Sequence, residues 1–356
     1  MSATGGDAIP NEADMRSARR SGAGIVLLLR LRTLAAATLM LAAAIPSARA
    51  QSFTIDDLVG AVVRIKTFIN PDGRSVQNLG RERQGSGIVI DENGLVLTIG
   101  YLMLEAHAAE LVTGTGRTVP ANVVGYDHDT GFGLLRAIEP LKIKPLAFGK
   151  ADTLKLDDPA LVVSFGGAGM MLPVHVASRR TFTGSWEYLI ESAIYTMPPH
   201  PQWSGAALVS REGKLVGVGS LIVGNAKDDT TVSPGNMFVP IDGLFPIMGD
   251  LLHSGRVAGP GKPWLGVNTQ ELGGKLFVAR VTPGSPAEKA GLKRGDQISG
   301  VKGEPVNTMA DFYRKLWALG AAGISVPLDV RRNGETQRME IPSANRMDHL
   351  KLKSTF

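Results

Sequence analysis

The sequence predicts a mainly β protein whose body is an all-β sandwich or barrel. Short apolar runs separated by turn residues recur along the chain, and no long segment with a 3.6-residue period lies between them. Between two of these runs, Asp91–Gly94 reads DENG, which is a strong hairpin signal. The 43 glycines and 21 prolines also favour many turns and short strands over long helices.

Length, composition and charge limit the class of protein. A chain of 356 residues is expected to hold about two domains, and 44% apolar residues is enough for packed cores. The absence of cysteine excludes disulfides and thiolate metal sites. Residues 1–50 carry six arginines against three acidic residues, so +3 of the net charge of +5 lies there and +2 in the rest. A nearly neutral body gives no electrostatic reason to expect nucleic-acid binding.

Residues 1–50 have the pattern of a secretory signal peptide. An apolar run, Leu34–Ile45, is followed by small residues at Ser47–Ala50, which match an A-x-A cleavage site. The run is too short to span a bilayer comfortably, so we expect cleavage after Ala50, a periplasmic mature chain and no remaining membrane segment. The alternative is a retained anchor, in which Ile25–Leu29 joins the run across two arginines. The basic residues before the run are Arg16, Arg19, Arg20, Arg30 and Arg32.

Residues 51–255 are expected to form one domain of short strands. An amphipathic stretch from Asp56 runs into a strand at Ala61–Ile65, and a polar loop follows at Asn70–Gln84. Gly85–Ile90 and Leu95–Thr98 flank the hairpin turn. The later apolar runs, each expected to be a strand, are Val123–Tyr126, Phe132–Arg136, Leu161–Phe165, Tyr188–Tyr195 and Leu215–Leu221.

A serine on a turn of small residues marks the second half of this domain. Ser204 lies in the sequence WSGAAL (Trp203–Leu208), which is followed by a polar turn and the apolar run Leu215–Leu221. This arrangement resembles the place where chymotrypsin-like proteases carry their nucleophile.

Three further segments resemble the HtrA/DegP family of periplasmic serine proteases. QGSGIVIDENGLVLT (Gln84–Thr98) is similar to the segment that leads to the catalytic histidine, and VVGYDHDTGFGLLR (Val123–Arg136) to the segment with the catalytic aspartate. NMFVPIDG (Asn236–Gly243) resembles the strand and turn that close the protease domain. The resemblance runs from about residue 56 to 345. It implies a chymotrypsin/trypsin-like double β-barrel with the active site between two six-stranded barrels.

The resemblance assigns the catalytic triad to three positions, of which only the serine is present. The family's histidine falls on Tyr101 and its aspartate on Gly131, whereas Ser204 keeps the nucleophile position. The implied oxyanion hole uses the backbone N–H groups of Ser204 and Gln202. Family members have glycine at the position of Gln202, because glycine easily adopts the backbone angles that the oxyanion hole requires. With glutamine there, the same peptide orientation costs more free energy.

These substitutions argue against ordinary triad hydrolysis. A serine hydroxyl is a poor nucleophile unless a base takes its proton, and a tyrosine with a pKa near 10 is only about one part in a thousand ionised at pH 7. Losing the base alone costs about 10⁴–10⁶ in rate. Asp127 and Asp129 are expected to be turn residues. A relocated base would have to be one of four histidines, which we expect to be exposed loop residues: His107, His128, His175 and His200.

The C-terminal part resembles a bacterial PDZ domain, an α+β fold expected at residues 263–345 after a linker at 256–262 and before a tail at 346–356. The segments that carry the resemblance are Pro263–Val267 and Val281–Leu316. Ala287–Leu292 is expected to be a short helix. Thr308 with Asp311 predicts a capping box that starts a second helix.

The PDZ resemblance implies a groove for peptide C-termini. The N–H groups of the turn Trp264-Leu265-Gly266-Val267 would face a peptide carboxylate, and the peptide would add as a strand between Gly266–Thr269 and the helix. The chain's last residues, Ser354-Thr355-Phe356, match a common PDZ ligand pattern, so we expect this tail to occupy its own or a neighbour's groove. The helix residues expected to line the groove, with core packing as the alternative, are Met309, Phe312 and Tyr313.

Together these features predict an exported pseudoprotease that binds unfolded proteins or peptide C-termini as a chaperone, adaptor or decoy. The edge strand Val216–Leu221 would offer a second peptide-binding surface. One alternative is an active serine endopeptidase of periplasmic protein quality control that uses Ser204. Another is a structural role in a trimer, either of this chain alone or with HtrA-like proteases. No cofactor is expected, and no cluster of His, Asp and Glu has metal-ligand spacing in the sequence.

Overall fold

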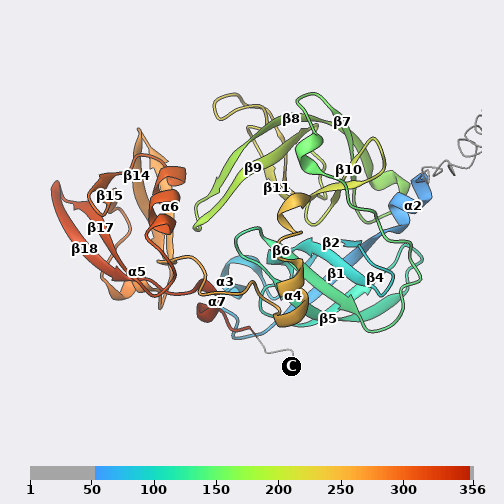
Figure 1. Cartoon of the computed structure of the whole chain (residues 1–356), viewed down its shortest axis with the longest axis horizontal. Coiled ribbons are helices and arrows are strands. Elements are labelled where there is room, and N and C mark those ends of the chain that lie inside the picture. The colour runs from blue at the N-terminus through green and yellow to red at the C-terminus, as the bar shows by residue number, and fades with distance from the viewer. Residues whose placement is uncertain (1–52, 353–356) are drawn as a thin grey trace, which may run out of the picture. The chain divides into compact units, whose positions relative to one another are not determined.

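The structure, a computed structural model, describes residues 53–352. It consists of two closed β-barrels followed by a six-stranded sheet (Figure 1). This confirms the predicted mainly β fold of a double barrel and a PDZ-like domain. The predicted signal peptide at residues 1–50 and the terminal Ser354-Thr355-Phe356 lie outside the described residues. Between residues 53 and 352 no helix is long and apolar enough to cross a membrane.

The first barrel is made of antiparallel strands that are hydrogen-bonded in the order β1-β2-β3-β6-β5-β4, and β4 closes the barrel on β1. The predicted hairpin turn at Asp91–Gly94 joins β2 to β3. The stretch expected to be a loop, Asn70–Gln84, contains helix α3 and the start of β2. The elements are α2 (Ile55–Gly60), β1 (Val62–Ile69), α3 (Val76–Leu79), β2 (Glu82–Val89), β3 (Leu95–Ile99), η2 (Gly100–Leu102), β4 (Ala106–Val112), β5 (Thr118–Tyr126) and β6 (Phe132–Ala137).

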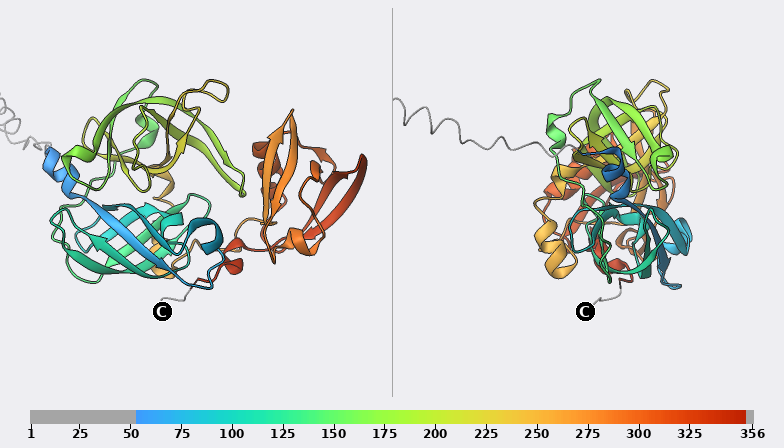
Figure 2. Two further views of the ribbon diagram at one scale, coloured as in Figure 1. Left: turned by 180° about the vertical axis from the view of Figure 1, so that it is seen from behind. Right: turned by 90° about the vertical axis from the view of Figure 1, so that its right-hand side faces the viewer.

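The second barrel has the strand order β10-β11-β12-β9-β8-β7 and is also closed. Figure 2 draws its strands in green to yellow. Its longest strands, β8 and β9, form a hairpin whose turn is at residues 185–187. The elements are η3 (Ala151–Thr153), β7 (Pro159–Val163), η4 (Ala168–Met170), β8 (Met171–Gly184), β9 (Tyr188–Met197), β10 (Ala207–Ser210), β11 (Leu215–Val223), β12 (Gly235–Pro240), η5 (Ile241–Gly243) and α4 (Met248–Ser254).

One hydrophobic cluster contains side chains from both barrels. Leu97 and Phe132 come from the first barrel, and Leu208 and Phe238 from the second, and none of the four has exposed surface. Because residues on successive positions of a strand point to opposite faces, the apolar strand runs read from the sequence supply both this cluster and a core inside each barrel. The shared cluster holds the two barrels together at the segment that carries Ser204.

The PDZ-like domain has its own core, which is built from one face of its sheet and helix α6. Thr308 caps α6 by accepting the N–H of Asp311 (3.1 Å), although the reciprocal half of the predicted capping box is not formed. The elements are β13 (Val267–Leu272), β14 (Lys275–Val281), α5 (Pro286–Lys289), β15 (Gln297–Val301), β16 (Glu304–Pro305), α6 (Met309–Ala318), β17 (Ser325–Arg332), β18 (Glu335–Pro342) and α7 (Arg346–His349).

The stretch between α4 and β13 contains no helix or long strand, but it is tied to the first barrel. Gly255 O accepts the N–H of Tyr126 (3.1 Å), and the Asp250 carboxylate accepts the N–H of Ala258 (3.0 Å). These bonds restrict the first part of the expected linker at 256–262, whose boundaries stay a prediction.

We expect Phe132→Ala to lower the free energy of unfolding by about 3–5 kcal/mol, because it leaves a cavity in the cluster shared by the two barrels. Ile138→Ala is the matched control, since Ile138 is 56% exposed and its truncation should change stability by less than about 0.5 kcal/mol. Urea denaturation measures both values. Equal effects of the two substitutions would contradict the shared core.

Candidate functional site

Ser204 lies on a turn before β10 that is hydrogen-bonded to both barrels. Ser204 O accepts the N–H of Ser86 in β2 (2.8 Å), and Gly205 N–H donates to Gly219 O in β11 (2.9 Å). Gly205 has a φ of +73°, and a Cβ at this position would collide with Ser86 O. Glycine is therefore required after the serine, and these bonds fix the backbone of the turn at Ser204.

The Ser204 hydroxyl is hydrogen-bonded to the phenol of Tyr101, which is on the short helix η2 directly after β3. The two oxygens are 2.8 Å apart, and the Tyr101 hydroxyl also donates to Ser220 O (2.8 Å). Because a phenol has one proton and that proton goes to Ser220 O, the Ser204 hydroxyl is the donor in the bond between the two side chains. The structure thus brings two of the sequence-predicted site residues together.

Burial favours the protonated form of the Tyr101 phenol near neutral pH. Loss of contact with water disfavours the phenolate and raises the pKa of Tyr101 to about 12, although the hydrogen bond with Ser204 opposes this shift. At pH 7 only about one phenol in 10⁵ is then ionised. The ionised phenolate is therefore about a hundredfold scarcer at pH 7 in the folded protein than the ordinary pKa of tyrosine suggests.

A tyrosine ring fills the space next to Gly131. A Cβ at residue 131 would lie 2.8 Å from the Tyr188 hydroxyl, which donates to Thr130 O (2.8 Å). Gly131 O accepts the N–H of Gly100 next to Tyr101 (2.6 Å). A carboxylate could replace Gly131 only if Tyr188 moved. Sequence reasoning did not find Tyr188, because residues 131 and 188 are distant in the chain.

The N–H of Gln202, assigned to the oxyanion hole, is already bound within the chain. It donates to Nδ1 of His200 (3.0 Å), so the proton of the imidazole is on Nε2, which lies 3.3 Å from Met170 O. Burial lowers the pKa of His200 and so keeps Nδ1 free to accept. The Asn236 side chain fixes the backbone of His200 through a bond of 2.6 Å.

The prediction that the four candidate histidines are exposed loop residues is wrong. His200 is 3% exposed and His175 is half-buried in β8, whereas His107 is exposed but belongs to strand β4. Nδ1 of His128 is 2.9 Å from the Tyr126 hydroxyl, and its Nε2 is 2.7 Å from Arg346 Nη1. Within residues 53–352 the side chain that hydrogen-bonds the Ser204 hydroxyl is Tyr101, and no histidine does so.

Asp127 has the turn role predicted for it. Its carboxylate accepts the N–H and the hydroxyl of Thr130, both at 2.7 Å. Asp129 forms an ion pair with Lys262 (3.0 Å). Neither carboxylate is hydrogen-bonded to a histidine, as the aspartate of a catalytic triad is. The described residues also contain no group of three His, Asp or Glu side chains that could hold a metal ion.

The prediction that Val216–Leu221 offers a free edge is wrong for most of its length. Gly217 and Val218 pair with β10 on one side and with β12 on the other. Gly219 N–H donates to Ala206 O (2.8 Å), and Ser220 O accepts the Tyr101 phenol. The chain itself therefore occupies this edge from Gly217 to Ser220.

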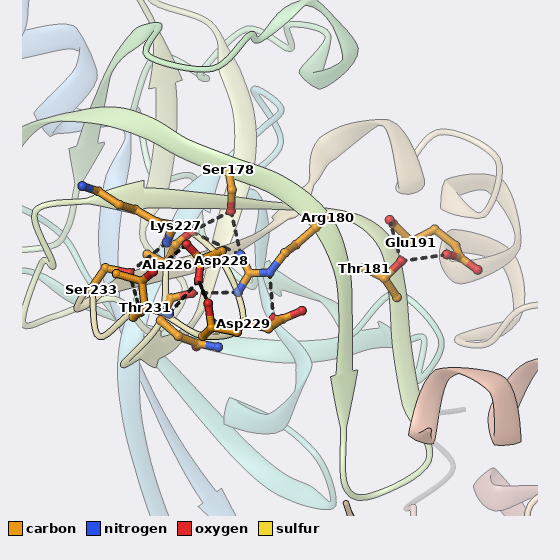
Figure 3. Close-up of polar contacts among 12 residues, drawn as sticks. Ser178, Arg180, Thr181, Glu191, Ala226, Lys227, Asp228, Asp229, Thr231 and Ser233 are labelled. Atoms are coloured by element: carbon orange, nitrogen blue, oxygen red, sulfur yellow. Dashed lines mark hydrogen bonds and ion pairs between the residues drawn. The ribbon is translucent and has the colours of Figure 1, made fainter. Parts of the chain in front are cut away.

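The loop after β11 is fastened to β8 by the side chain of Arg180 (Figure 3). The guanidinium donates to Asn225 O (2.7 Å), to Ser178 Oγ (2.6 Å) and to the Asp229 carboxylate (3.0 Å). Within this loop, the Asp228 carboxylate accepts hydrogen bonds from the N–H and hydroxyl groups of Thr230 and Thr231. These bonds lower the pKa of the Asp228 carboxyl. These bonds fix the loop next to the strand that carries Ser220.

In the PDZ-like domain, the predicted carboxylate-binding turn already holds a carboxylate of this chain. Leu265, Gly266 and Val267 direct their N–H groups at Glu187, whereas the N–H of Trp264 donates to Ala344 O (3.0 Å). Three of the four turn residues assigned from the sequence therefore donate their N–H groups to one carboxylate.

The helix residues assigned to the groove differ in their burial. Phe312 and Tyr313 have no exposed surface and belong to the PDZ core, as does Leu316. Met309 is partly buried against that core, and its N–H donates to the Glu271 carboxylate (2.6 Å). The Tyr313 hydroxyl reaches out of the core and donates to Gly184 O in the β8–β9 hairpin (2.8 Å).

Comparison with known proteins agrees with both folds. A trypsin-like peptidase domain family model matches residues 85–218, and a PDZ domain model matches residues 263–342. A solved structure titled HtrA-type protease AlgW with decapeptide is 19% identical. It covers 85% of this chain and 100% of its own, with a TM-score of 0.51, which supports the fold alone.

Several curated relatives are similar in sequence. The periplasmic pH-dependent serine endoprotease DegQ of Escherichia coli (strain K12) is 27% identical over 275 residues, or 73% of this chain and 59% of its own length. A probable periplasmic serine endoprotease, DegP-like, of Rhizobium meliloti (strain 1021) is 25% identical over 292 residues, or 76% of this chain and 55% of its own. The chain therefore spans little more than half the length of these relatives.

We expect the stability of the protein to fall steeply above pH 10. Burial raises the pKa of every tyrosine in the chain, whereas the unfolded chain titrates near 10. Above pH 10 the folded state therefore binds more protons than the unfolded state, and each tyrosine loses up to about 1.4 kcal/mol of stabilisation per pH unit. The five residues are Tyr101, Tyr126, Tyr188, Tyr195 and Tyr313.

Absorbance at the tyrosinate band measures this directly. The folded protein should show almost no tyrosinate at pH 10.5, and a step of five tyrosinates should accompany alkaline unfolding. Normal titration of one or more tyrosines near pH 10 in the folded state would contradict the burial described above.

Proposed function

Because the chain belongs to the HtrA-like family, which joins a trypsin-like domain to a PDZ domain, we propose that it is a proteolytically inactive member that binds peptides. In this proposal it binds unfolded proteins or peptide C-termini as a chaperone, adaptor or decoy. The observation that carries the proposal is the contact of the Ser204 hydroxyl with the phenol of Tyr101, at the position where a base would have to act.

The Tyr101 phenol cannot activate Ser204 in the way an imidazole would. A general base near neutral pH needs a pKa close to the working pH, and burial raises the pKa of Tyr101 to about 12. The phenol's own proton is also committed to Ser220 O. Without a base, the serine hydroxyl keeps its proton and attacks an amide about 10⁴–10⁶ times more slowly.

The remaining parts of a triad site support the same conclusion. The N–H of Gln202 is held by His200 Nδ1, and the loss of one oxyanion donor costs about 10²–10³ in rate. Tyr188 stands where an orienting carboxylate at residue 131 would need space. Restoring hydrolysis would therefore require several groups to move together.

Peptide binding is a capacity that the fold still supports. The converging N–H groups of Leu265, Gly266 and Val267 suit a carboxylate, and β13 beside α6 suits an added strand. We assign peptide binding to this groove and not to β11, whose edge the chain itself occupies.

We further propose that the protein acts in the periplasm. The relatives named above are periplasmic endoproteases by their names, and residues 1–50 have the composition of a signal peptide with cleavage after Ala50. No cofactor is required for this function. A trimer, of this chain alone or with HtrA-like proteases, stays a prediction of the resemblance.

A fluorophosphonate probe tests the proposal without knowledge of a substrate. We expect no labelling of Ser204 at pH 7.5, no cleavage of casein, and suppressed aggregation of an unfolded client protein that stays intact. An active trypsin-fold protease is the positive control, and Ser204→Ala the negative one. Labelling of the wild type that Ser204→Ala abolishes would show that Ser204 is activated and would favour the alternative of an active endopeptidase.

We also expect Tyr101→His to remain inactive towards casein and the probe. The imidazole would meet Ser204, but position 131 would still lack a carboxylate and the N–H of Gln202 would still be bound to His200. The same casein and probe assays measure this variant. A gain of more than about 10³ in labelling rate would show that the missing base was the main obstacle.

A further inference from the structure

The carboxylate of Glu187 is bound in the PDZ turn by three backbone N–H groups. Its Oε2 accepts the N–H of Leu265 (2.9 Å), and its Oε1 accepts those of Gly266 (2.6 Å) and Val267 (2.8 Å). Glu187 belongs to the turn of the β8–β9 hairpin in the second barrel and is only 3% exposed. A carboxylate from the protease-like domain thus has the environment that a peptide C-terminus would need.

The backbone before Glu187 continues along the groove as a bound peptide would. Ser185 O accepts the N–H of Thr269 in β13 (2.9 Å), and Gly184 O accepts the hydroxyl of Tyr313 in α6 (2.8 Å). Ser185 precedes Glu187 by two positions, as Val267 precedes Thr269. Strand pairing repeats every second residue, so this spacing is the one expected for an added strand.

Side chains of the hairpin add apolar and charged contacts. Leu189 packs against the hydrophobic core of the PDZ-like domain. The Glu191 carboxylate forms an ion pair with Arg314 of α6 (2.6 Å), and both side chains are largely exposed. The hairpin therefore occupies the carboxylate position of the turn and bonds β13 beside it, and Leu189 adds an apolar contact with the same domain.

The turn is also held from its other side. Arg346 of α7 donates to Trp186 O (2.6 Å), and its Nη1 is 2.7 Å from Nε2 of His128. The Trp186 ring stacks on Tyr188, with ring centroids 5.8 Å apart. Glu187 itself has a φ of +56°, which residues other than glycine rarely adopt. Such a conformation persists only where surrounding contacts impose it.

We propose that the β8–β9 turn is an internal ligand of the PDZ groove, with the Glu187 side chain in place of a peptide's terminal carboxylate. A peptide C-terminus and Glu187 cannot bind the same three N–H groups at once, so peptide binding requires release of the hairpin. This inference rests on the proposed peptide-binding function and adds its regulation. The apparent affinity for a peptide is then reduced by the fraction of molecules in which the groove is open.

Peptide binding to Glu187→Ala tests the competition. The probe is a fluorescein-labelled decapeptide that ends in Lys351–Phe356 of this chain with a free carboxylate, and its amidated form is the control ligand. We expect the full-length Glu187→Ala chain to bind the free acid more than about tenfold more tightly than the wild type. Glu212→Ala, at an exposed turn of the same barrel, should bind as the wild type does. Equal affinity of the wild type and Glu187→Ala would overturn the inference.

A cross-link tests the same point without removing the carboxylate. The chain has no cysteine, and the side chains of Ser185 and Asn268 meet at 3.5 Å, so Ser185→Cys with Asn268→Cys should form a disulfide. The oxidised double variant should lose peptide binding and regain it on reduction. Undiminished binding by the oxidised form would contradict an occupied groove.

Hydrogen exchange separates this inference from the proposed function. If neither the wild type nor Glu187→Ala binds the peptide, the peptide-binding function is wrong, but the internal contact can still be measured. The amides of Leu265, Gly266 and Val267 should exchange slowly in the wild type and more than about tenfold faster in Glu187→Ala. Fast exchange in both proteins would show that Glu187 does not occupy the turn.

Discussion

The hydrogen bonds of the Tyr101 phenol connect the segments that form the candidate catalytic site. The phenol lies at the end of β3, the Ser204 hydroxyl before β10, and Ser220 O in β11, so one buried hydroxyl joins the first barrel to two parts of the second. Ser220 is buried, so loss of the phenol would remove a donor from its backbone oxygen, and an unpaired buried polar group costs about 1–3 kcal/mol. The Ser204 hydroxyl therefore donates to a phenol and not to an imidazole.

At three positions where a ligand could bind, other residues of the chain already occupy the hydrogen-bond donors or the space. The N–H of Gln202 is bound by His200, the space at residue 131 is filled by Tyr188, and the PDZ turn is bound by Glu187. Leu265, Gly266 and Val267 are buried, and buried N–H groups must find an acceptor in the free protein. In an active enzyme some of them stay available for the transition state, whereas here they are used for the stability of the fold. In the function proposed above, this difference is what distinguishes the chain from a hydrolase with the same barrels.

Local patterns in the sequence predicted most of the strands and the serine turn. The DENG hairpin, the apolar runs and Gly205 are local features, and each has a direct structural consequence. The contacts that decide function join distant residues, for example Tyr101 with Ser204 and Glu187 with Gly266. No periodicity or turn signal reports such pairs, so the occupied PDZ turn could not be read from the sequence. The burial of His200 was missed for another reason. Pro199 and Pro201 indicate a loop, and this loop is buried at His200, whose backbone N–H donates to the Asn236 side chain and whose Nε2 lies 3.3 Å from Met170 O.

The pH dependence of Ser204 modification tests the central claim most directly. The second-order rate constant for reaction with a fluorophosphonate, followed by intact mass between pH 6 and 9, reports whether a base assists the hydroxyl. With the phenol of Tyr101 as the contact of Ser204, the rate should stay at the level of an unactivated serine and show no inflection near neutral pH. A fast reaction with an inflection near pH 6.5–7 would reveal an imidazole base and contradict the account.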